Sequence, residues 1–539
     1  MSNKRLIKST GLIGLATSAS RVLGFARDVL IANFFGTTVF AEAFVVAFRI
    51  PNLLRDLVGE GAANAAFVPV LTEYCTKRTR EEFWDLARNL LHVLVVVLFV
   101  VSICGILLAP VIVRLIAPGF IGDAQKLAIT VDLTRIMFPF IFLIGLVAYG
   151  MGVLNSLNHF AVPAFGPVLL NISMIFFLVY VCPKIGVKGL ALAVLAGGAL
   201  QVITIGYMLR RKGLRFISPI RNTSFDPSGP GREFGIRGLY KGLIHPAIKR
   251  IWKLLVPRFF GSAVYQLSVI VDNIFSTFEW IVGMGAPAAL WYSYRLFHLP
   301  LAIFGISLAT VALPRMSREV AEKNIPSLKD TIGFSMRSVF LVLIPAGIGL
   351  ATLGRPIIKI LFERGEFTQY SVDITNNALF FYSFGLFACG GIKILVNAFF
   401  SLGDTRTPVK TAAAAFFINL VLNFVLMWPL KIGGLALATS IAATSNFIML
   451  YIFLTKKIGP LGTPKIIGAL GRILLAGLIM GAFSYAAGRF ITGLGAGIFV
   501  NAAGILGAVL LSAVIYAGLC AAFGIKEIKK LIEWVLRKR

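Results

Sequence analysis

Long apolar stretches follow one another along almost the entire chain and are separated by short polar segments. About 14 of these stretches reach roughly 20 residues, the length at which a helix spans the hydrocarbon core of a bilayer. They begin near Gly11, Thr38, Leu90, Val131, Val162, Gly189, Val256, Pro287, Ser338, Ile374, Val409, Gly434, Gly468 and Ile498. The pattern predicts an all-α polytopic membrane protein with about 14 transmembrane helices.

The composition supports this class. Hydrophobic residues make up 58% of the 539 residues and charged residues 14%, whereas soluble domains carry about 25% charged residues. The five cysteines are scattered without a CxxC motif, and the four histidines are isolated in the sequence. We therefore expect neither disulfides nor a metal centre.

The net charge of +29 is distributed unevenly along the chain. If successive spans cross the membrane in opposite directions, most Lys and Arg residues fall in loops on the side of the N-terminus. This asymmetry predicts that both termini lie in the cytoplasm. The basic residues then set the topology and contact anionic membrane lipids, so we expect no nucleic-acid partner.

The sequence contains an internal repeat. Gly189 and Gly434 lie in similar segments 245 positions apart, and Pro163 and Pro408 are separated by the same interval. The repeat predicts two homologous halves of about six spans each, both entering the membrane from the same side. Such parallel repeats form an N-lobe and a C-lobe around a central cavity, which is where we expect the substrate site.

These features divide the chain into four predicted parts. The N-lobe covers residues 1–210, and a basic cytoplasmic linker with an amphipathic helix near its end covers residues 211–253. The C-lobe covers residues 254–456, and residues 457–539 hold two further spans and a basic cytoplasmic tail. The small residues of the thirteenth span, with Gly477 and Gly481 four apart, favour close helix packing. Those last two spans either pack on the C-lobe or form a lipid-facing groove.

Arginines recur inside the apolar stretches, at positions 21, 27, 49, 55 and 295. A cation near the centre of a bilayer costs about 2.5–3.5 kcal/mol on insertion scales. Two interpretations remain open. The arginines line a cavity that takes an anionic ligand, to whose phosphate oxygens guanidinium groups are well matched. Alternatively, they form internal ion pairs that join helices, for which Asp28, seven positions after Arg21 and on the same helix face, is a candidate partner.

A second polar group lies in the latter half of the chain. It consists of Asp272, Asn419, Asn423 and Thr439, each within or at the edge of a predicted span. Oxygen ligands of this kind suit a hard monovalent cation or a proton relay. The alternative is that these side chains form hydrogen bonds between helices.

Four segments resemble the MurJ/MviN family of bacterial lipid II flippases, which belong to the multidrug/oligosaccharidyl-lipid/polysaccharide exporter superfamily. They are SRVLGFARD at residues 20–28, FRIPNLLR at 48–55, GEGA at 59–62 and AFVPVL at 66–71. The resemblance extends over nearly the whole chain. It departs at Tyr294, where many relatives carry an acid, and at Arg49, where some carry lysine.

The resemblance implies that the protein flips undecaprenyl-diphosphate-linked disaccharide-pentapeptide from the cytoplasmic to the periplasmic leaflet of the bacterial inner membrane by alternating access. It implies that the diphosphate and acidic groups are bound by side chains matching those of the family's cavity, and that the last two spans hold the polyprenyl tail. The expected substrate-binding residues are Arg21, Arg27, Asp28, Arg49, Arg55, Glu60 and Arg295.

We expect a transporter without catalytic residues or a bound cofactor. No GxxxxGK[ST] loop is present, which disfavours direct ATP hydrolysis. The membrane potential, together with coupling to a monovalent cation or a proton, is the expected energy source. The expected partners are lipid II, membrane lipids and the cell-wall synthesis machinery, and the functional form is expected to be a monomer.

Two other functions remain open. The protein could flip another polyprenyl-linked oligosaccharide, or it could be a polyprenyl-phosphate-dependent membrane transferase. A transferase needs acidic catalytic residues on a sizeable external loop, whereas the external loops predicted here are short.

Overall fold

The computed structural model describes residues 3–55, 67–214, 245–493, 497–525 and 527–528. Within these residues every regular element is helical. The chain forms two compact units. Unit 1 comprises Met1–Phe35 and Val39–Gln266, and unit 2 comprises Gly36–Thr38 and Leu267–Arg539. The four-part division at residues 210, 253 and 456 and the central cavity between the lobes stay predictions.

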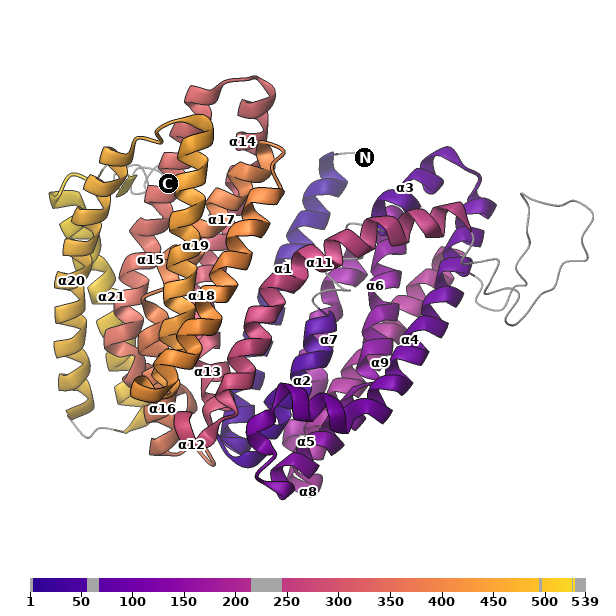
Figure 1. Cartoon of the computed structure of the whole chain (residues 1–539), viewed down its shortest axis with the longest axis horizontal. Coiled ribbons are helices and arrows are strands. Elements are labelled where there is room, and N and C mark those ends of the chain that lie inside the picture. Colours follow the sequence, from indigo (N-terminus) through magenta and orange to yellow (C-terminus); the bar gives the residue numbers. More distant parts are fainter. Residues whose placement is uncertain (1–2, 56–66, 215–244, 494–496, 526, 529–539) are drawn as a thin grey trace, which may run out of the picture. The chain divides into compact units, whose positions relative to one another are not determined.

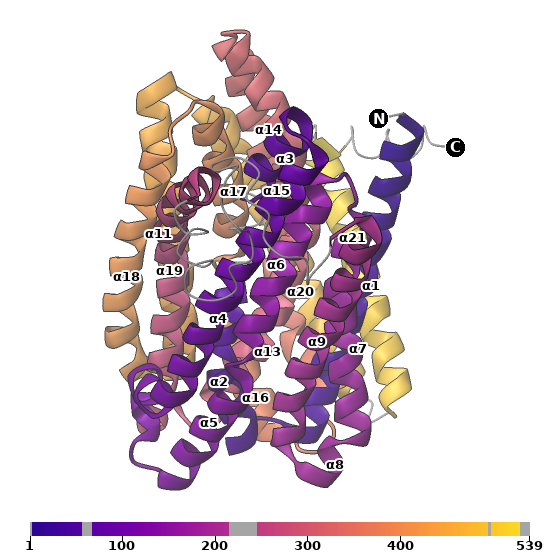
Figure 2. The same ribbon diagram turned by 90° about the vertical axis from the view of Figure 1, so that its right-hand side faces the viewer.

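Unit 1 is a bundle of helices in which α7 packs against both α1 and α9 (Figure 1, Figure 2). Thr79 and Glu82 cap the start of α4, each side chain accepting a hydrogen bond from the other residue's backbone N–H, at 3.3 and 3.2 Å. The helices are α1 (Asn3–Phe35), α2 (Val39–Arg55), α3 (Val68–Lys77), α4 (Arg80–Ile116), η2 (Pro118–Phe120), α5 (Ala124–Met137), α6 (Phe140–Ser156), α7 (Ala161–Tyr180), α8 (Cys182–Ile185), α9 (Val187–Lys212) and the first part of α11 (Pro246–Ser276).

Unit 2 is a second bundle, in which α18 lies beside α19 and α20 packs on α15 (Figure 1). Its helices after α11 are α12 (Glu279–Val282), α13 (Ala286–Pro300), the π-helix η3 (Leu301–Ile306), α14 (Ser307–Ala321), α15 (Ile325–Phe362), α16 (Gln369–Ser383), α17 (Leu386–Ser401), α18 (Arg406–Leu430), α19 (Ile432–Ile458), α20 (Thr463–Gly493) and α21 (Ile498–Ala522).

The prediction of an all-α membrane protein is confirmed. The described residues hold ten helices that are long and apolar enough to cross a membrane, or eleven if α16 and α17, bent by 45° at their junction, form one span. The predicted number of about 14 is not reached by this measure. The arginine-bearing helices α1 and α2 are not among the ten; α2 has only 17 residues, and buried charges lower the apolarity of α1.

The helix boundaries recur at the interval seen in the sequence. Helix α4 begins at Arg80 and α15 at Ile325, 245 positions later. Helix α7 begins at Ala161 and α18 at Arg406, again 245 positions apart. The recurrence supports two homologous halves, and their equivalence in three dimensions stays a prediction.

Gly477 and Gly481 of α20 lie against α15, as the small-residue pattern indicated. A Cβ atom on Gly477 would come within 2.7 Å of Ile348, and one on Gly481 within 2.5 Å of the same side chain. Leu474, Leu475 and Leu478 on the same helix are exposed. Helix α20 therefore buries its small-residue face on α15 and presents apolar side chains to the surroundings, which suits contact with lipid.

A buried ion pair joins α2 to α5 in unit 1. The ammonium group of Lys126 pairs with the carboxylate of Glu42, and both side chains are at most 2% exposed. The same ammonium group lies 4.2 Å from the centroid of the Phe120 ring, which adds a cation–π contact. Because a single charge left here would be buried, the pair ties the two helices together.

Candidate functional site

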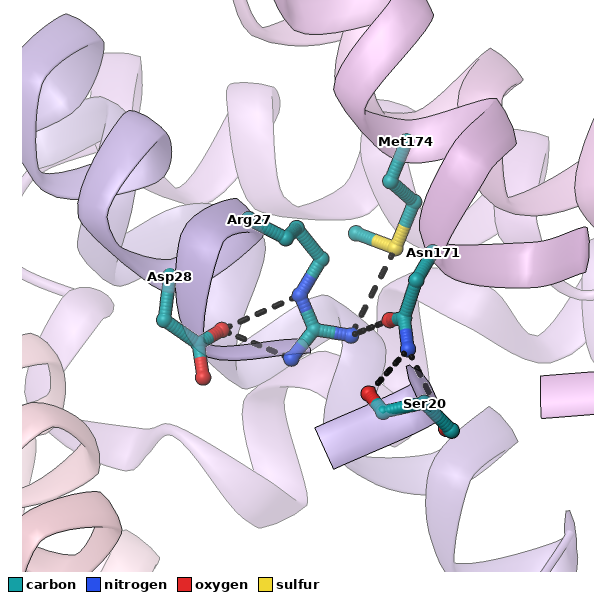
Figure 3. A network of polar contacts seen from close by, with 5 residues as sticks. All are labelled: Ser20, Arg27, Asp28, Asn171 and Met174. Carbon is teal, nitrogen blue, oxygen red and sulfur yellow. Dashed lines mark hydrogen bonds and ion pairs between the residues drawn. The ribbon is translucent and has the colours of Figure 1, made fainter. Parts of the chain in front are cut away.

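Arg27 of α1 is the centre of a polar network inside unit 1 (Figure 3). Its Nε and Nη2 atoms donate to Oδ1 of Asp28 at 3.0 and 2.6 Å. Its Nη1 atom donates to Oδ1 of Asn171 on α7 at 2.9 Å and contacts Sδ of Met174 at 3.9 Å. Arg27 is 8% exposed and Asp28 3% exposed. The guanidinium is thus oriented by groups from two helices and shielded from solvent.

The amide of Asn171 extends this network back to α1. Its Nδ2 atom donates to the carbonyl oxygen of Ser20 at 3.0 Å, and the Ser20 hydroxyl lies 3.4 Å away (Figure 3). Gly24 lies beside the amide, where an added Cβ would stand 3.5 Å from Nδ2. One asparagine side chain therefore holds Arg27 with its oxygen and the backbone of α1 with its nitrogen.

The partner of Asp28 differs from the one that ideal helix geometry suggests. Positions seven apart share a helix face, which places Asp28 below Arg21. In the structure Asp28 pairs with Arg27, and Arg21 is exposed on the same helix. The difference arises because a guanidinium on a long, flexible stem can turn to the neighbouring residue.

The remaining predicted residues of the first half lie on or after α2. Arg49 and Arg55 are half-buried, and Arg55 is the last residue of α2. Glu60 lies outside the residues that the structure describes.

Arg295 lies on α13 in unit 2 and is exposed. Its guanidinium carbon lies 4.5 Å from the centroid of the Trp291 ring, one turn earlier on the same helix. Tyr294, the preceding residue, has ring contacts with His298 and Tyr382 at centroid distances of 5.6 and 6.2 Å. The Trp291 ring therefore lies against the guanidinium of Arg295 and restricts the orientation of this planar head group.

The four polar residues predicted as a cation site come together in unit 2. Asp272 of α11 accepts hydrogen bonds from Nδ2 of Asn423 at 2.7 Å and from Oγ1 of Thr439 at 3.0 Å. Asn423 also donates to Asn419 Oδ1 at 3.2 Å, and Asn419 donates to Thr439 at 3.4 Å. Three helices, α11, α18 and α19, thus meet at one carboxylate.

Asn423 is fully buried, and its Oδ1 atom has no hydrogen-bond partner among the described residues. An acceptor left unsatisfied inside a protein carries a desolvation cost. The cluster contains a carboxylate, two amide oxygens and a hydroxyl, ligand types that suit a hard cation or a proton better than a soft metal. In the structure Asn423 turns its Nδ2 atom toward the carboxylate. The contacts seen here are also hydrogen bonds between helices, so both interpretations from the sequence are compatible with them.

Sequence reasoning missed Asn171, Met174 and Trp291. Asn171 is an isolated amide in the apolar stretch of α7, and Met174 follows it on the same helix face. A lone amide in a membrane-spanning helix is a usable signal, because it needs a polar partner on a neighbouring helix. The partner itself lies 144 positions away in the sequence and could not be chosen without the fold.

Comparison with known proteins gives consistent matches. The family model described as "Lipid II flippase MurJ" matches residues 31–503. A Vibrio cholerae protein named "Probable lipid II flippase MurJ" is 33% identical, with 98% of this chain and 99% of that protein covered. A Burkholderia cenocepacia protein named "Lipid II flippase MurJ" is 35% identical over 82% of each chain.

Solved structures also match this chain. The structure described as "Lipid II flippase MurJ, inward closed conformation" matches with a TM-score of 0.76 and 25% identity, covering 95% of this chain and 99% of that one. An inward-facing multidrug resistance transporter of the MATE family matches with a TM-score of 0.67 at 15% identity, covering 82% of this chain and 96% of that one. The second likeness concerns the fold alone.

Proposed function

The chain belongs to the MurJ family of lipid II flippases, and from this premise we propose that it moves lipid II from the cytoplasmic to the periplasmic leaflet. It is a multi-pass protein of the bacterial inner membrane and a transporter, not an enzyme. The family match and the overall structural likeness favour lipid II over another polyprenyl-linked oligosaccharide and over a transferase reaction.

The polar network around the buried Arg27 carries the proposal at the level of chemistry. Arg21, Arg27, Arg49, Arg55 and Arg295 are the proposed cations that bind the diphosphate and the acidic groups of the peptide, and the carboxylates of Asp28 and Glu60 belong to the same proposed site. Asp28 holds Arg27 in the absence of substrate, and a diphosphate with its higher charge competes for the same N–H groups. The headgroup then exchanges its hydration for fixed guanidinium groups while its polyprenyl tail stays in the bilayer.

Trp291 supports the role of Arg295. A guanidinium stacked on an aromatic ring presents its N–H groups along its edge, which is the geometry that bidentate phosphate recognition requires. The stack also restricts the side chain before substrate arrives, so less conformational entropy is lost on binding.

The cluster around Asp272 is the proposed coupling site. We propose that it takes up a monovalent cation or a proton, which alters the charge at the junction of α11, α18 and α19. The membrane potential supplies about 2.3 kcal/mol per charge per 100 mV. This is enough to bias an alternating-access equilibrium between states separated by a few kcal/mol. Both predicted lobes lie in one chain, so we propose that a monomer suffices, and association with cell-wall synthesis proteins remains an expectation.

The test measures the accessibility of lipid II in the outer leaflet of cells depleted of this protein. Wild type, Arg27→Ala and Arg295→Ala are each expressed as the only copy. Arg489→Ala is the matched control, because Arg489 also lies near an aromatic ring, 5.8 Å from the centroid of Tyr485 on α20. We expect wild type and the control to restore accessibility, and both site variants to reach the membrane without restoring it.

Two outcomes would contradict parts of the proposal. Unchanged accessibility on depletion would mean that the substrate is another polyprenyl-linked glycan or that a second flippase operates. If both Arg27→Ala and Arg295→Ala restored accessibility fully, neither arginine would be required for substrate binding. Arg27 would then be interpreted as part of an internal ion pair with Asp28.

A further inference from the structure

A pocket of about 360 Å³ opens between α3 and the start of α11 in unit 1. Its wall includes Lys77 and Arg78 at the end of α3 and Arg250 in the first turns of α11, all exposed. The lining is completed by Val70, Glu73, Tyr74, Pro246 and Ala247. Three cations thus face one carboxylate across a concave surface whose lining contains none of the arginines of the proposed transport site.

The single carboxylate is already used to position two of the cations. Glu73 accepts a hydrogen bond from Nη1 of Arg250 at 2.7 Å, and Nζ of Lys77 lies 3.7 Å from its other oxygen. The hydrogen bond and the charge of Arg250, followed by the charge of Lys77, hold the pKa of Glu73 below its ordinary value of 4.5. The carboxylate therefore stays ionised at neutral pH, and the pocket keeps a surplus of positive charge.

The two walls are also held in place. Ala247, Ile248 and Ile251 of α11 are at most 5% exposed, whereas Lys249, Arg250 and Lys253 on the other face are exposed. The rings of Tyr74 and His245 lie 6.4 Å apart at the pocket's edge. Burial lowers the pKa of His245, so its neutral ring accepts the backbone N–H of Ala247 through Nδ1 at 3.2 Å. The start of α11 is thus anchored by its buried face, and the ion pair of Arg250 with Glu73 connects it to α3.

The pocket lies where a membrane surface is expected. Arg80, two residues after Arg78, begins α4, which is long and apolar enough to span a bilayer. The charge pattern of the sequence assigns this end of unit 1 to the cytoplasm, where the leaflet surface is rich in anionic lipid.

We propose that the pocket formed by Lys77, Arg78 and Arg250 binds a phosphate-bearing anion, the headgroup of an acidic phospholipid of the cytoplasmic leaflet. Arg250 and Arg78 offer planar N–H edges to the phosphate oxygens, Lys77 offers a point charge, and the phenol of Tyr74 is a further donor. The bound headgroup joins α3 to α11 and so fixes the start of the helix that leads from the linker into unit 2. This inference does not rest on the lipid II function.

The test uses the full chain purified in detergent and follows its thermal unfolding. The probes are soluble dihexanoyl phosphatidylglycerol, dihexanoyl phosphatidylcholine and inorganic phosphate, each titrated so that the rise in melting temperature gives an apparent affinity. The pocket variant is Lys77→Gln/Arg78→Gln. Its matched control is Lys249→Gln/Lys253→Gln, which removes the same charge from exposed positions outside the pocket lining.

We expect phosphatidylglycerol, but not phosphatidylcholine, to raise the melting temperature of the wild type. The pocket variant should bind it about 25-fold more weakly, because it removes two basic residues and each one near a lipid surface contributes roughly a factor of five. The control should lose far less. Glu73→Gln should bind more tightly than wild type, since it removes the one negative charge among the described lining residues. If the double variant does not fold, the single variants Arg78→Gln, in the pocket, and Lys249→Gln, outside it, are compared in the same way.

The remaining outcomes separate the sources of phosphate. Inorganic phosphate could raise the melting temperature at the same concentrations as the lipid. If that rise depended in the same way on Lys77, Arg78 and Glu73, the result would support the site and assign it to free phosphate. Equal losses in the pocket and control variants would overturn the proposal in favour of a general basic surface. An absence of any shift with either anion would overturn it as well.

Discussion

Arg27 shows how a cation is kept inside an apolar bundle. Its three guanidinium nitrogens donate to Asp28 and Asn171, so the cost of burying the charge is offset by charge-assisted hydrogen bonds. Of these partners, Asp28 also carries the compensating charge, whereas Asn171 supplies only direction. The two contributions can therefore be separated by substitution.

Replacing Asn171 with leucine should impair lipid II flipping while leaving the charge balance of α1 intact. The acceptor of Arg27 Nη1 is lost, and hydrogen bonds to charged groups contribute about 1.5–3 kcal/mol. We expect the rate to fall by about tenfold or more. Ser173→Ala is the control on the same helix, since its hydroxyl bonds to the carbonyl oxygen of Ala193 instead. Wild-type flipping by Asn171→Leu would show that the orientation of Arg27 is not critical.

Asp272 is the residue on which coupling should depend. Sodium ions, compared with choline at equal ionic strength, should raise the melting temperature of the wild type, because a ligand that binds only the folded state stabilises it. Asp272→Asn should abolish that shift. A wild type that responds to pH but not to sodium would instead assign the site to a proton. A sodium shift retained in Asp272→Asn would place cation binding elsewhere.

Among the elements, α20 illustrates how a helix is attached to the bundle by its small residues. Gly477 and Gly481 allow α20 to approach Ile348 of α15, while Gly468 and Gly471, nearer its start, have open space around them. Glycine therefore permits close helix packing in the middle of α20 and has no such role near its start.

Gly481→Val should lower the melting temperature of the purified protein clearly more than Gly471→Val. Both variants gain the same β-branched side chain on the same helix, so their intrinsic helix propensities change equally. Only the first forces atoms into Ile348, and overpacking costs about 1–3 kcal/mol. Similar melting temperatures for the two variants would mean that α20 is not closely packed on α15.

The elements also show what could be predicted from the sequence and what could not. Apolar length and the 245-residue repeat predicted the helices, because both depend on local or periodic patterns. The grouping of Asp272 with Asn419, Asn423 and Thr439 was predicted as well, since polar residues in spans must meet one another. The pairing of Arg27 with Asn171 and the pocket beside Arg250 were not predicted. Both depend on which helices become neighbours, and neither α1–α7 nor α3–α11 is adjacent in the sequence.

At the scale of the whole molecule, the charge distribution predicts which end of unit 1 faces the cytoplasm. In both views of unit 1, α3 lies at one end and α8 at the other (Figure 1, Figure 2). The uneven distribution of Lys and Arg predicts that the α3 end is cytoplasmic.

Cysteine labelling in intact cells tests this orientation. A variant that retains Cys75 alone places one exposed thiol on α3. Gly122→Cys in a cysteine-free background places one in the exposed turn before α5. We expect a membrane-impermeant maleimide to label Gly122→Cys in intact cells, and Cys75 only after permeabilisation. The opposite result would invert the predicted topology and place the phosphate pocket at the periplasmic surface.

The pair of Glu42 and Lys126 has a consequence for the history of this protein. Neither residue can change alone without leaving a buried charge, and breaking a buried pair costs about 3–5 kcal/mol. A lineage therefore reaches an apolar pair through an unstable intermediate or through two nearly simultaneous changes. Across related sequences, the columns of Glu42 and Lys126, 84 positions apart, should vary together: acid with base, or apolar with apolar.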